Sequence, residues 1–379
     1  MRSDGVNPWV TIETLAPAAM SVVSVGDTPR DFAGWQRVLQ RLFAKAPALY
    51  DGLTTVALGA AIAAACEDGE VTQLTIRTGS GPHQVKLHPV VGPTGGVHAV
   101  RLWLGPASVE PPPVPEAAGV VWDAETQTLL LSREITRLVH GVSDDQYVPR
   151  ISVAEFFQQV SFDRHADMLD LFYSPEPDGR LQCDVAVGLD TDRPAKWRIT
   201  GRYRPTEHGD GAWLLIEAAI SDDRVARPTL ERAGLREAHR RSGTYLAVIQ
   251  LEHANIAHWL TDPAPWIRWD YLFRPADVFH PDDRDRLIGI GDRLGSGDTA
   301  GITVRTLGYW GGYSETSLLL SAYPECSNRQ RALAQLVSVA GYLPTSPPQA
   351  REDVAALAVR GYDDQLRHRR GGMSRTAMW

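Results

Sequence analysis

Short alternations of apolar and polar residues run through much of the chain, and they predict β-strands. Residues 71–78 (VTQLTIRT) and 181–190 (LQCDVAVGLD) are typical, and glycine-rich turns separate neighbouring runs. Alternation of this kind buries one face of a strand, and closely spaced turns join such strands antiparallel. Other stretches, such as residues 35–43 and 152–160, have helical spacing. The pattern therefore predicts an α+β fold built on antiparallel sheets.

Two further helices follow from local sequence. Residues 56–66 (VALGAAIAAAC) are apolar almost throughout, and we expect a buried helix there. Ser132 is a suitable cap for a helix that Gly141 ends.

Two breaks divide the chain into three modules. Residues 105–119 contain five prolines, which remove amide donors and hold the backbone extended. Residues 221–243 are rich in arginine and mostly polar. The predicted parts are a first module (1–105), a proline-rich linker (106–118), a second module (119–223), a helical linker (224–242), a third module (243–342) and a flexible tail (343–379).

A faint internal repeat joins the second and third modules. Residues 160–169 (VSFDRHADML) and 278–287 (VFHPDDRDRL) both precede a strand–turn–strand unit, although they match at only three positions. The shared order of elements favours a duplicated fold.

The stretch HPDDRD, residues 280–285, could be a metal or acid–base site, or simply the start of a helix. Pro281 suits the first helical position, and Asp282 and Asp283 suit the positive end of the helix dipole. From the third helical position, the Asp283 side chain can reach back to the amide of the cap residue His280. We therefore expect the cluster to serve the helix and to bind no metal.

Composition narrows the class of protein. The chain has 379 residues and a net charge of −8, which disfavours nucleic-acid binding. No apolar run is long enough to cross a bilayer, and no signal peptide is evident. The three cysteines, Cys66, Cys183 and Cys326, are far apart and indicate a reducing compartment. We expect a cytoplasmic protein that acts neither on membranes nor on nucleic acid.

The HPDDR phrase, placed before an antiparallel strand pair, resembles that of PAS sensor domains. The resemblance is clearest over residues 243–323 and weaker over residues 118–223, which have FDRHAD instead. The first module is similar to PAS or GAF domains. The arrangement resembles a family of actinobacterial proteins built only of such domains. It implies three PAS/GAF-like modules, each an antiparallel sheet with helices on one face.

Candidate ligand-binding residues lie in the part of the third module that the resemblance places around a cavity. They are His258, Trp259, Trp266, Trp269 and Tyr271. Aromatic rings with a few polar groups suit a small-molecule pocket, but such rings also fill small cores. A lone histidine could ligate haem, although a structural role is commoner. We expect no tightly bound cofactor.

Motifs of catalysis are missing from the sequence. It contains no GxxxxGK[ST], GxSxG or HExxH motif, and we identify no catalytic residue. The expected function is a non-catalytic signalling scaffold that senses small molecules or partners and relays the signal to another protein. Two alternatives stay open: a divergent hydrolase of a small metabolite, and a structural adaptor that binds no ligand.

Overall fold

The computed structural model describes most of the chain. The described residues are 7–16, 19–45, 54–79, 81–138, 144–161, 164–173, 176–187, 195–204, 211–219, 230–270, 275–291, 293–294, 298–323 and 331–339. The candidate residue Tyr271, the cysteine Cys326 and the predicted tail at 343–379 lie outside these ranges.

The first sheet has six antiparallel strands in the order β3-β2-β1-β6-β5-β4. The strands are β1 (Val10–Glu13), β2 (Ser21–Val25), β3 (Thr28–Gly34), β4 (Thr72–Thr78), β5 (Gly81–Val91) and β6 (Val97–Pro106). Helices α1 (Trp35–Lys45) and α3 (Thr55–Asp68) pack on one face of the sheet. The hydroxyl of Thr54 accepts a hydrogen bond from the amide of Ala57 at 3.1 Å and so caps α3, which Gly69 ends at φ 66°.

Helix α3 is not buried on all sides. Leu58, Ile62 and Ala65 face the sheet and are buried, whereas Val56 is 81% exposed. The prediction of a buried helix is therefore wrong for its outer side, because only one face of the helix meets the sheet.

The second sheet has seven strands in the order β10-β11-β12-β13-β7-β8-β9. The strands are β7 (Ala117–Asp123), β8 (Thr128–Leu131), β9 (Arg150–Ser152), β10 (Val160–Ser161), β11 (Arg180–Val187), β12 (Ala195–Tyr203) and β13 (Gly211–Ala218). Helix α4 (Val153–Gln159) forms where helical spacing was predicted over residues 152–160, and helix α5 (His165–Tyr173) follows β10. The short 3₁₀ helix η3 (Asp144–Gln146) precedes β9.

The helix expected after Ser132 is tighter than predicted over its described residues, and Gly141, which was expected to end it, lies outside them. Residues there form the 3₁₀ helix η2 (Arg133–Leu138). The Ser132 hydroxyl accepts a hydrogen bond from the amide of Gly119 at 3.2 Å. Because that contact ties Ser132 to β7, its side chain does not cap an α-helix.

The third sheet has five strands in the order β15-β14-β18-β17-β16. The strands are β14 (Tyr245–Gln250), β15 (Asn255–Trp259), β16 (Thr299–Leu307), β17 (Tyr313–Ala322) and β18 (Arg331–Ser338). Helix α6 (Leu230–Ser242) precedes β14 and lies within the stretch predicted as a helical linker. The 3₁₀ helix η4 (Pro275–Val278) and helix α7 (Pro281–Gly291) lie between β15 and β16 in the chain.

One strand order underlies all three sheets. Counted along the chain, five neighbouring strands of each sheet stand in the order second, first, fifth, fourth, third. They are β2-β1-β6-β5-β4, β8-β7-β13-β12-β11 and β15-β14-β18-β17-β16. The first sheet adds the seven-residue strand β3 at one edge, and the second sheet adds the short strands β9 and β10. The fold is thus α+β, with three antiparallel sheets of one plan.

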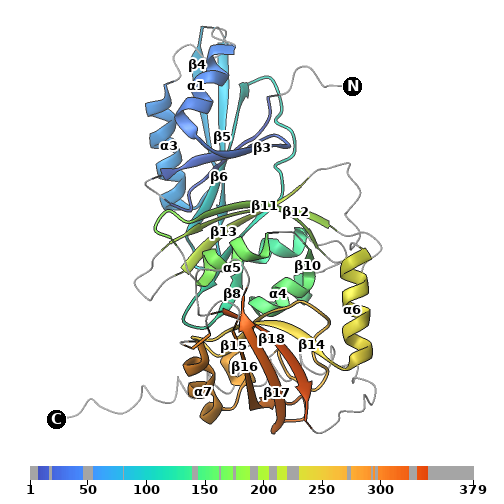
Figure 1. Cartoon of the computed structure of the whole chain (residues 1–379). Coiled ribbons are helices and arrows are strands. Elements are labelled where there is room, and N and C mark those ends of the chain that lie inside the picture. The colour runs from blue at the N-terminus through green and yellow to red at the C-terminus, as the bar shows by residue number, and fades with distance from the viewer. Residues whose placement is uncertain are drawn as a thin grey trace, which may run out of the picture.

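The three sheets pack on one another in chain order (Figure 1). The face of the first sheet opposite α1 and α3 packs on the second sheet, through a core that includes Val23, Trp213 and Leu215. Helices α4 and α5 cover the other face of the second sheet. The core on that side extends to Val248 and Ala257 of the third sheet. Apolar packing is therefore continuous across both interfaces.

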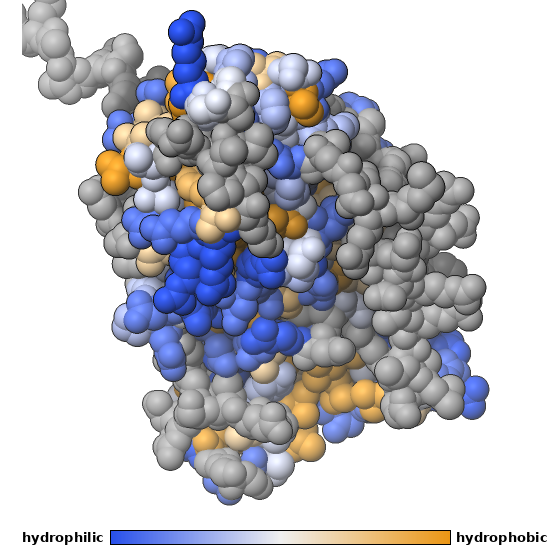
Figure 2. Space-filling view, turned by 90° about the horizontal axis from the view of Figure 1, so that it is seen from above, coloured by the Kyte–Doolittle hydropathy of each residue, from blue (hydrophilic) through white to orange (hydrophobic). Residues whose placement is uncertain are grey.

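Figure 2 looks onto the end of the molecule that carries α1 and β4, where hydrophilic residues gather near the centre of the view. Among the described helices, none is both long and apolar enough to span a bilayer.

Candidate functional site

Three of the predicted pocket residues lie together in the third sheet's core. Trp259 is 1% exposed, and its ring meets that of Trp269 edge to face at 6.5 Å. The Trp266 Nε1–H donates to the hydroxyl of Thr316 at 3.0 Å, and its ring meets Tyr245 at 5.1 Å. The rings therefore pack against one another and against the sheet.

His258 lies apart from these tryptophans. Its ring stacks on His165 at 4.6 Å and meets Phe157 at 4.9 Å. Both partners belong to the helical side of the second sheet, so the structure places His258 at the interface between the second and third sheets. A shared pocket of His258 with the tryptophans does not form among the described residues. Their ligand role stays a prediction.

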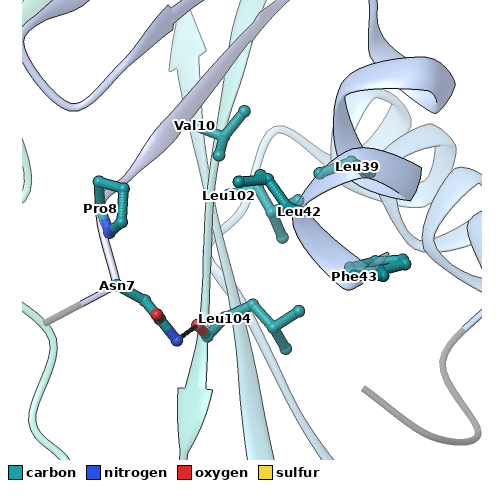
Figure 3. Close-up of a pocket in the computed structure, with 8 residues that line it drawn as sticks. All are labelled: Asn7, Pro8, Val10, Leu39, Leu42, Phe43, Leu102 and Leu104. Atoms are coloured by element: carbon teal, nitrogen blue, oxygen red, sulfur yellow. Dashed lines mark hydrogen bonds between the residues drawn. The ribbon is translucent and has the colours of Figure 1, made fainter. Parts of the chain in front are cut away.

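Two cavities lie elsewhere. The first, of about 50 Å³, is lined by apolar residues of α1 and of the first sheet (Figure 3). Leu39, Leu42 and Phe43 point into it, and the Asn7 amide donates to the Leu104 carbonyl at its rim at 2.7 Å. Pockets for small ligands usually enclose about 300 Å³ or more, so this one is too small. An open groove of about 310 Å³ between α7 and β16 is mostly polar.

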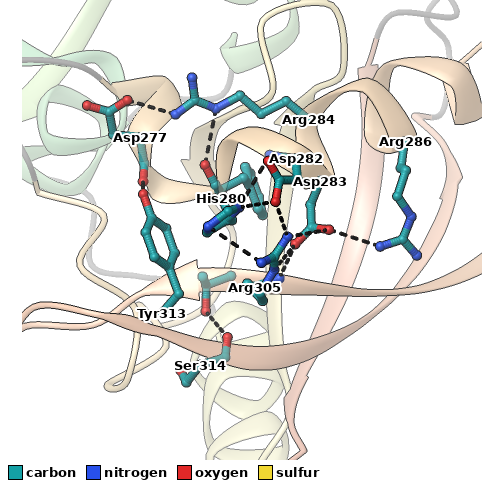
Figure 4. A network of polar contacts seen from close by, with 11 residues as sticks. Asp277, His280, Asp282, Asp283, Arg284, Arg286, Arg305, Tyr313 and Ser314 are labelled. Atoms are coloured by element: carbon teal, nitrogen blue, oxygen red, sulfur yellow. Dashed lines mark hydrogen bonds and ion pairs between the residues drawn. The ribbon is translucent and has the colours of Figure 1, made fainter.

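The HPDDRD stretch forms the start of α7, as predicted (Figure 4). Pro281 is the first helical residue, and the His280 carbonyl accepts from the amide of Asp283 at 2.9 Å. The Asp282 amide donates to Nδ1 of the His280 ring at 3.3 Å. Local capping thus accounts for the histidine and the proline.

The Asp283 side chain does not bind the amide of His280, contrary to the prediction. The His280 amide donates to the Arg305 carbonyl on β16 at 2.9 Å, so Asp283 does not cap it. The Asp283 carboxylate instead accepts from the backbone N–H and the Nε of Arg305, each at 2.9 Å, and from Nη1 of Arg286 at 3.0 Å. Burial alone would raise the pKa of Asp283, but these donors lower it to about 2. The carboxylate therefore ties the helix start to the edge strand.

The other acidic groups of this cluster also face arginines. Asp277 accepts from Nη2 of Arg284 at 2.7 Å, and Asp282 accepts from Nη2 of Arg305 at 3.1 Å. Within the described residues, no group of three or more His, Cys, Asp and Glu side chains could hold a metal ion. The arrangement stabilises the junction of α7 with β16.

A buried ion pair joins the first and second sheets. The side chain of Glu13 on β1 is fully buried, and that of Arg202 on β12 is 10% exposed. The Glu13 carboxylate accepts from Nε and Nη2 of Arg202 at 2.9 and 2.8 Å, from the Leu15 amide at 3.1 Å and from the hydroxyl of Ser21. The Arg202 guanidinium also lies over the Phe32 ring at 4.7 Å. The pair links the two sheets through donors that satisfy both carboxylate oxygens.

A second carboxylate lies in the same interface. Glu217 on β13 accepts from the hydroxyls of Thr11 and Ser24 at 2.8 and 3.1 Å. Burial raises its pKa, and these hydroxyls oppose the shift. Nearby, His98 stacks on Trp213 at 4.5 Å.

Burial lowers the pKa of His98 to about 4, although its Nδ1–H donates to the Leu214 carbonyl at 2.7 Å. The imidazole is therefore neutral at pH 7.

The interface of the second and third sheets also contains polar links. The Asn255 amide on β15 donates to Oε1 of Gln127, the residue before β8, at 2.9 Å. Arg331 on β18 is 1% exposed and donates to the carboxylate of Asp170 on α5. Gln250 on β14 lies opposite Asn255 on one neighbouring strand and Arg331 on the other. Its side chain is fully buried, and neither the nitrogen nor the oxygen of its amide has a hydrogen-bond partner among the described residues.

Sequence patterns alone would not have identified these interface residues. Glu13 occupies a polar position of a short alternating strand, which alone predicts a solvent-facing side chain. The one available signal was the presence of charged or amide residues inside otherwise apolar strands, as with Glu217 in GAWLLIEA.

Comparison with known proteins supports the fold and gives no function. Residues 8–113 match the family model described as Rv3651-like, N-terminal. A crystal structure of an uncharacterised protein from Mycobacterium tuberculosis is similar, with a TM-score of 0.68 and 20% identity, covering 89% of this chain and 97% of that one. At that identity the likeness shows a shared fold over nearly the whole chain.

The structure of an RNA-binding light-oxygen-voltage receptor is also similar, at a TM-score of 0.23 and 11% identity, covering 59% of this chain and 95% of that one. A similarity this low carries no conclusion. No curated protein matches the chain.

Proposed function

We propose that the chain is a non-catalytic sensor scaffold of three PAS/GAF-like modules, which relays small-molecule or partner signals through protein contacts. The repeated strand order supports the three-module part of this proposal, because one plan used three times indicates duplication of a single module. The resemblance of the HPDDR phrase to PAS domains supplies the sensor class, and that phrase stands at a helix start whose Asp283 is buried and bound to Arg305.

The observation that carries the relay is the chemistry of the two interfaces. The Glu13–Arg202 pair joins the first and second sheets, and the Gln127–Asn255 hydrogen bond joins the second and third. Buried charges are costly unless paired, so an interface that contains them is favourable in one alignment only. A change of shape in one module would therefore shift its neighbour.

Hydrogen exchange of the full chain tests the relay without knowledge of the ligand. Glu13→Gln weakens the first interface, and the relay predicts faster exchange in β14 and β15 of the third sheet as well as in β1 and β12. Glu237→Gln is the matched control, since Glu237 pairs with Arg240 and Arg241 on the exposed side of α6. Changes confined to the first two sheets would contradict the relay and favour a passive adaptor.

Native mass spectrometry of protein purified from its own host tests the input. A bound metabolite or a co-purifying protein is the expected result, and a bare chain in every preparation would count against a sensor. Turnover of nucleotides or of a panel of small metabolites by clean protein would support the hydrolase alternative instead.

A further inference from the structure

Strand β4 forms one edge of the first sheet, and it lacks the protection found on the other edges. It pairs only with β5, over seven residues and without a bulge. Every second residue of an edge strand directs its N–H and C=O away from the sheet, which makes a template for another strand. The sequence TQLTIRT contains no proline and a single charged residue, Arg77, so little in it blocks such pairing.

The opposite edge of the same sheet is protected. Strand β3 carries Pro29, Arg30 and Asp31, and its pairing with β2 is irregular. Phe32 adds a positive φ of 41°. These features bend the strand and remove donors, so β3 is a poor template.

The edges of the other two sheets are short or are engaged by a helix or a loop. Strands β9 and β10 have three and two residues. Strand β15 packs on α4, and the backbone of Arg305 on β16 is engaged by Asp283 and His280 at the start of α7. Among the described residues, β4 is thus a long edge with no such contact, whereas the nine-residue edge strand β16 is engaged at Arg305 and Thr306.

The sequence of β4 is nearly palindromic, and this identifies the partner. In an antiparallel pair of two copies centred on Thr75, Thr75 faces Thr75 and Leu74 faces Ile76. Gln73 then faces Arg77, and Thr72 faces Thr78. Each position meets one of like polarity, and no two like charges are opposed. Leu74 is 39% exposed in the single chain, so this pairing would also cover apolar surface.

The helix on the same side of the sheet is compatible with a second copy. Helix α3 packs over β5 and β6, and it has no charged residue between Thr55 and Cys66. Its exposed positions there, beyond Val56, are alanines. An apolar helix surface beside the edge does not repel the same surface of a second copy. It also has no charged side chains that would favour its exposure to water.

We propose that two copies of the chain pair through β4 in an antiparallel, two-fold arrangement centred on Thr75. The pairing joins the two six-stranded sheets into one continuous sheet. The two-fold axis closes the assembly as a dimer, because the same edge is used by both copies.

Analytical ultracentrifugation of the full chain tests the dimer and its register. Gln73→Arg sets arginine against Arg77 of the second copy twice per dimer, so the dimer should weaken roughly tenfold at low salt. Adding Arg77→Glu to that variant replaces both repulsions by attractions and should restore association. Thr28→Lys, an exposed threonine on the protected strand β3, is the matched control and should leave association unchanged.

A covalent test does not depend on affinity. Thr75→Cys places two thiols directly opposite each other, where paired Cα atoms are about 4.5–5.5 Å apart, within reach of a disulfide. Mild oxidation should give a covalent dimer, whereas Thr28→Cys and the unmodified chain should not. Melting curves check that each variant is folded. A monomeric wild-type chain overturns the proposal, and so does a dimer that ignores Gln73→Arg and fails to cross-link at position 75.

Discussion

Replacing Glu13 by glutamine should lower the free energy of unfolding by about 3 kcal/mol. The side chain of Glu13 is fully exposed in the unfolded chain and fully buried in the folded one, where it holds the charge of Arg202. Glutamine keeps the size and one acceptor oxygen, but it leaves the guanidinium without a counter-charge at 10% exposure. Loss of one partner from a buried pair typically costs about 3–5 kcal/mol, and the retained acceptor places glutamine at the lower end.

Urea unfolding followed by circular dichroism and tryptophan fluorescence measures this loss. Glu237→Gln on α6 serves as the surface control, because its pairs with Arg240 and Arg241 are solvent-exposed. Its unfolding midpoint should be nearly that of the wild type.

A double-mutant cycle separates the ion pair from other effects of the substitution. Arg202→Met removes the charge and keeps most of the side chain's length, but it leaves the Glu13 carboxylate buried without its cation. Glu13→Gln combined with Arg202→Met contains neither buried charge, and we expect it to lose about 2 kcal/mol less than the sum of the single losses. Additive losses, or a Glu13→Gln loss no larger than that of the surface control, would refute this account of the interface.

Three further predictions concern single buried groups. Asp283→Ala should lower the free energy of unfolding by about 2 kcal/mol, because three charged or backbone donors lose their acceptor. The same substitution at the exposed neighbour Asp282 should lower it little, and equal melting temperatures of the two variants would contradict this. Because burial lowers the pKa of His98 to about 4, the imidazole binds a proton in the unfolded chain before it does so in the folded one. The free energy of unfolding should therefore fall by about 2 kcal/mol between pH 7 and pH 5, and the denaturant midpoint of His98→Asn should change less over that range. Gln250→Met should stabilise the chain by about 1 kcal/mol if its amide is unpaired, while Gln335→Met on the partly exposed β18 should not; a destabilised Gln250 variant would reveal a bound partner.

Strands were well predicted because their signal is local. Period-two alternation in TQLTIRT and RLQCDVAV follows from the geometry of a strand with one buried face. The start of α7 was predictable for the same reason, since Pro281 and the acidic first turn suit any helix N-terminus.

Contacts between distant segments were not predictable. Ser132 looked like a helix cap, but its hydroxyl accepts from Gly119, thirteen residues away. Asp283 looked like a capping partner of His280, but the stronger donor was Arg305, twenty-two residues along the chain. In both cases a long-range donor competed with a local one, and the sequence contains no measure of that competition.

The face of β1 illustrates the limit most clearly. Thr11 and Glu13 alternate with Val10 and Ile12, which indicates a strand with one solvent-facing side. In the folded chain the polar side is buried as well, because the second sheet covers it. Alternation reports the chemistry of each face and not whether another sheet lies upon it.

The polar character of that face has a consequence for the relation between the sheets. An interface made only of residues such as Val23 and Leu215 would be nearly as favourable after a small slide, because apolar burial is not directional. The Glu13–Arg202 pair changes this, since a displacement that separates the two groups leaves two charges buried and uncompensated. The pair therefore contributes less to holding the sheets together than to fixing how they are aligned, and the proposed relay requires such a fixed alignment.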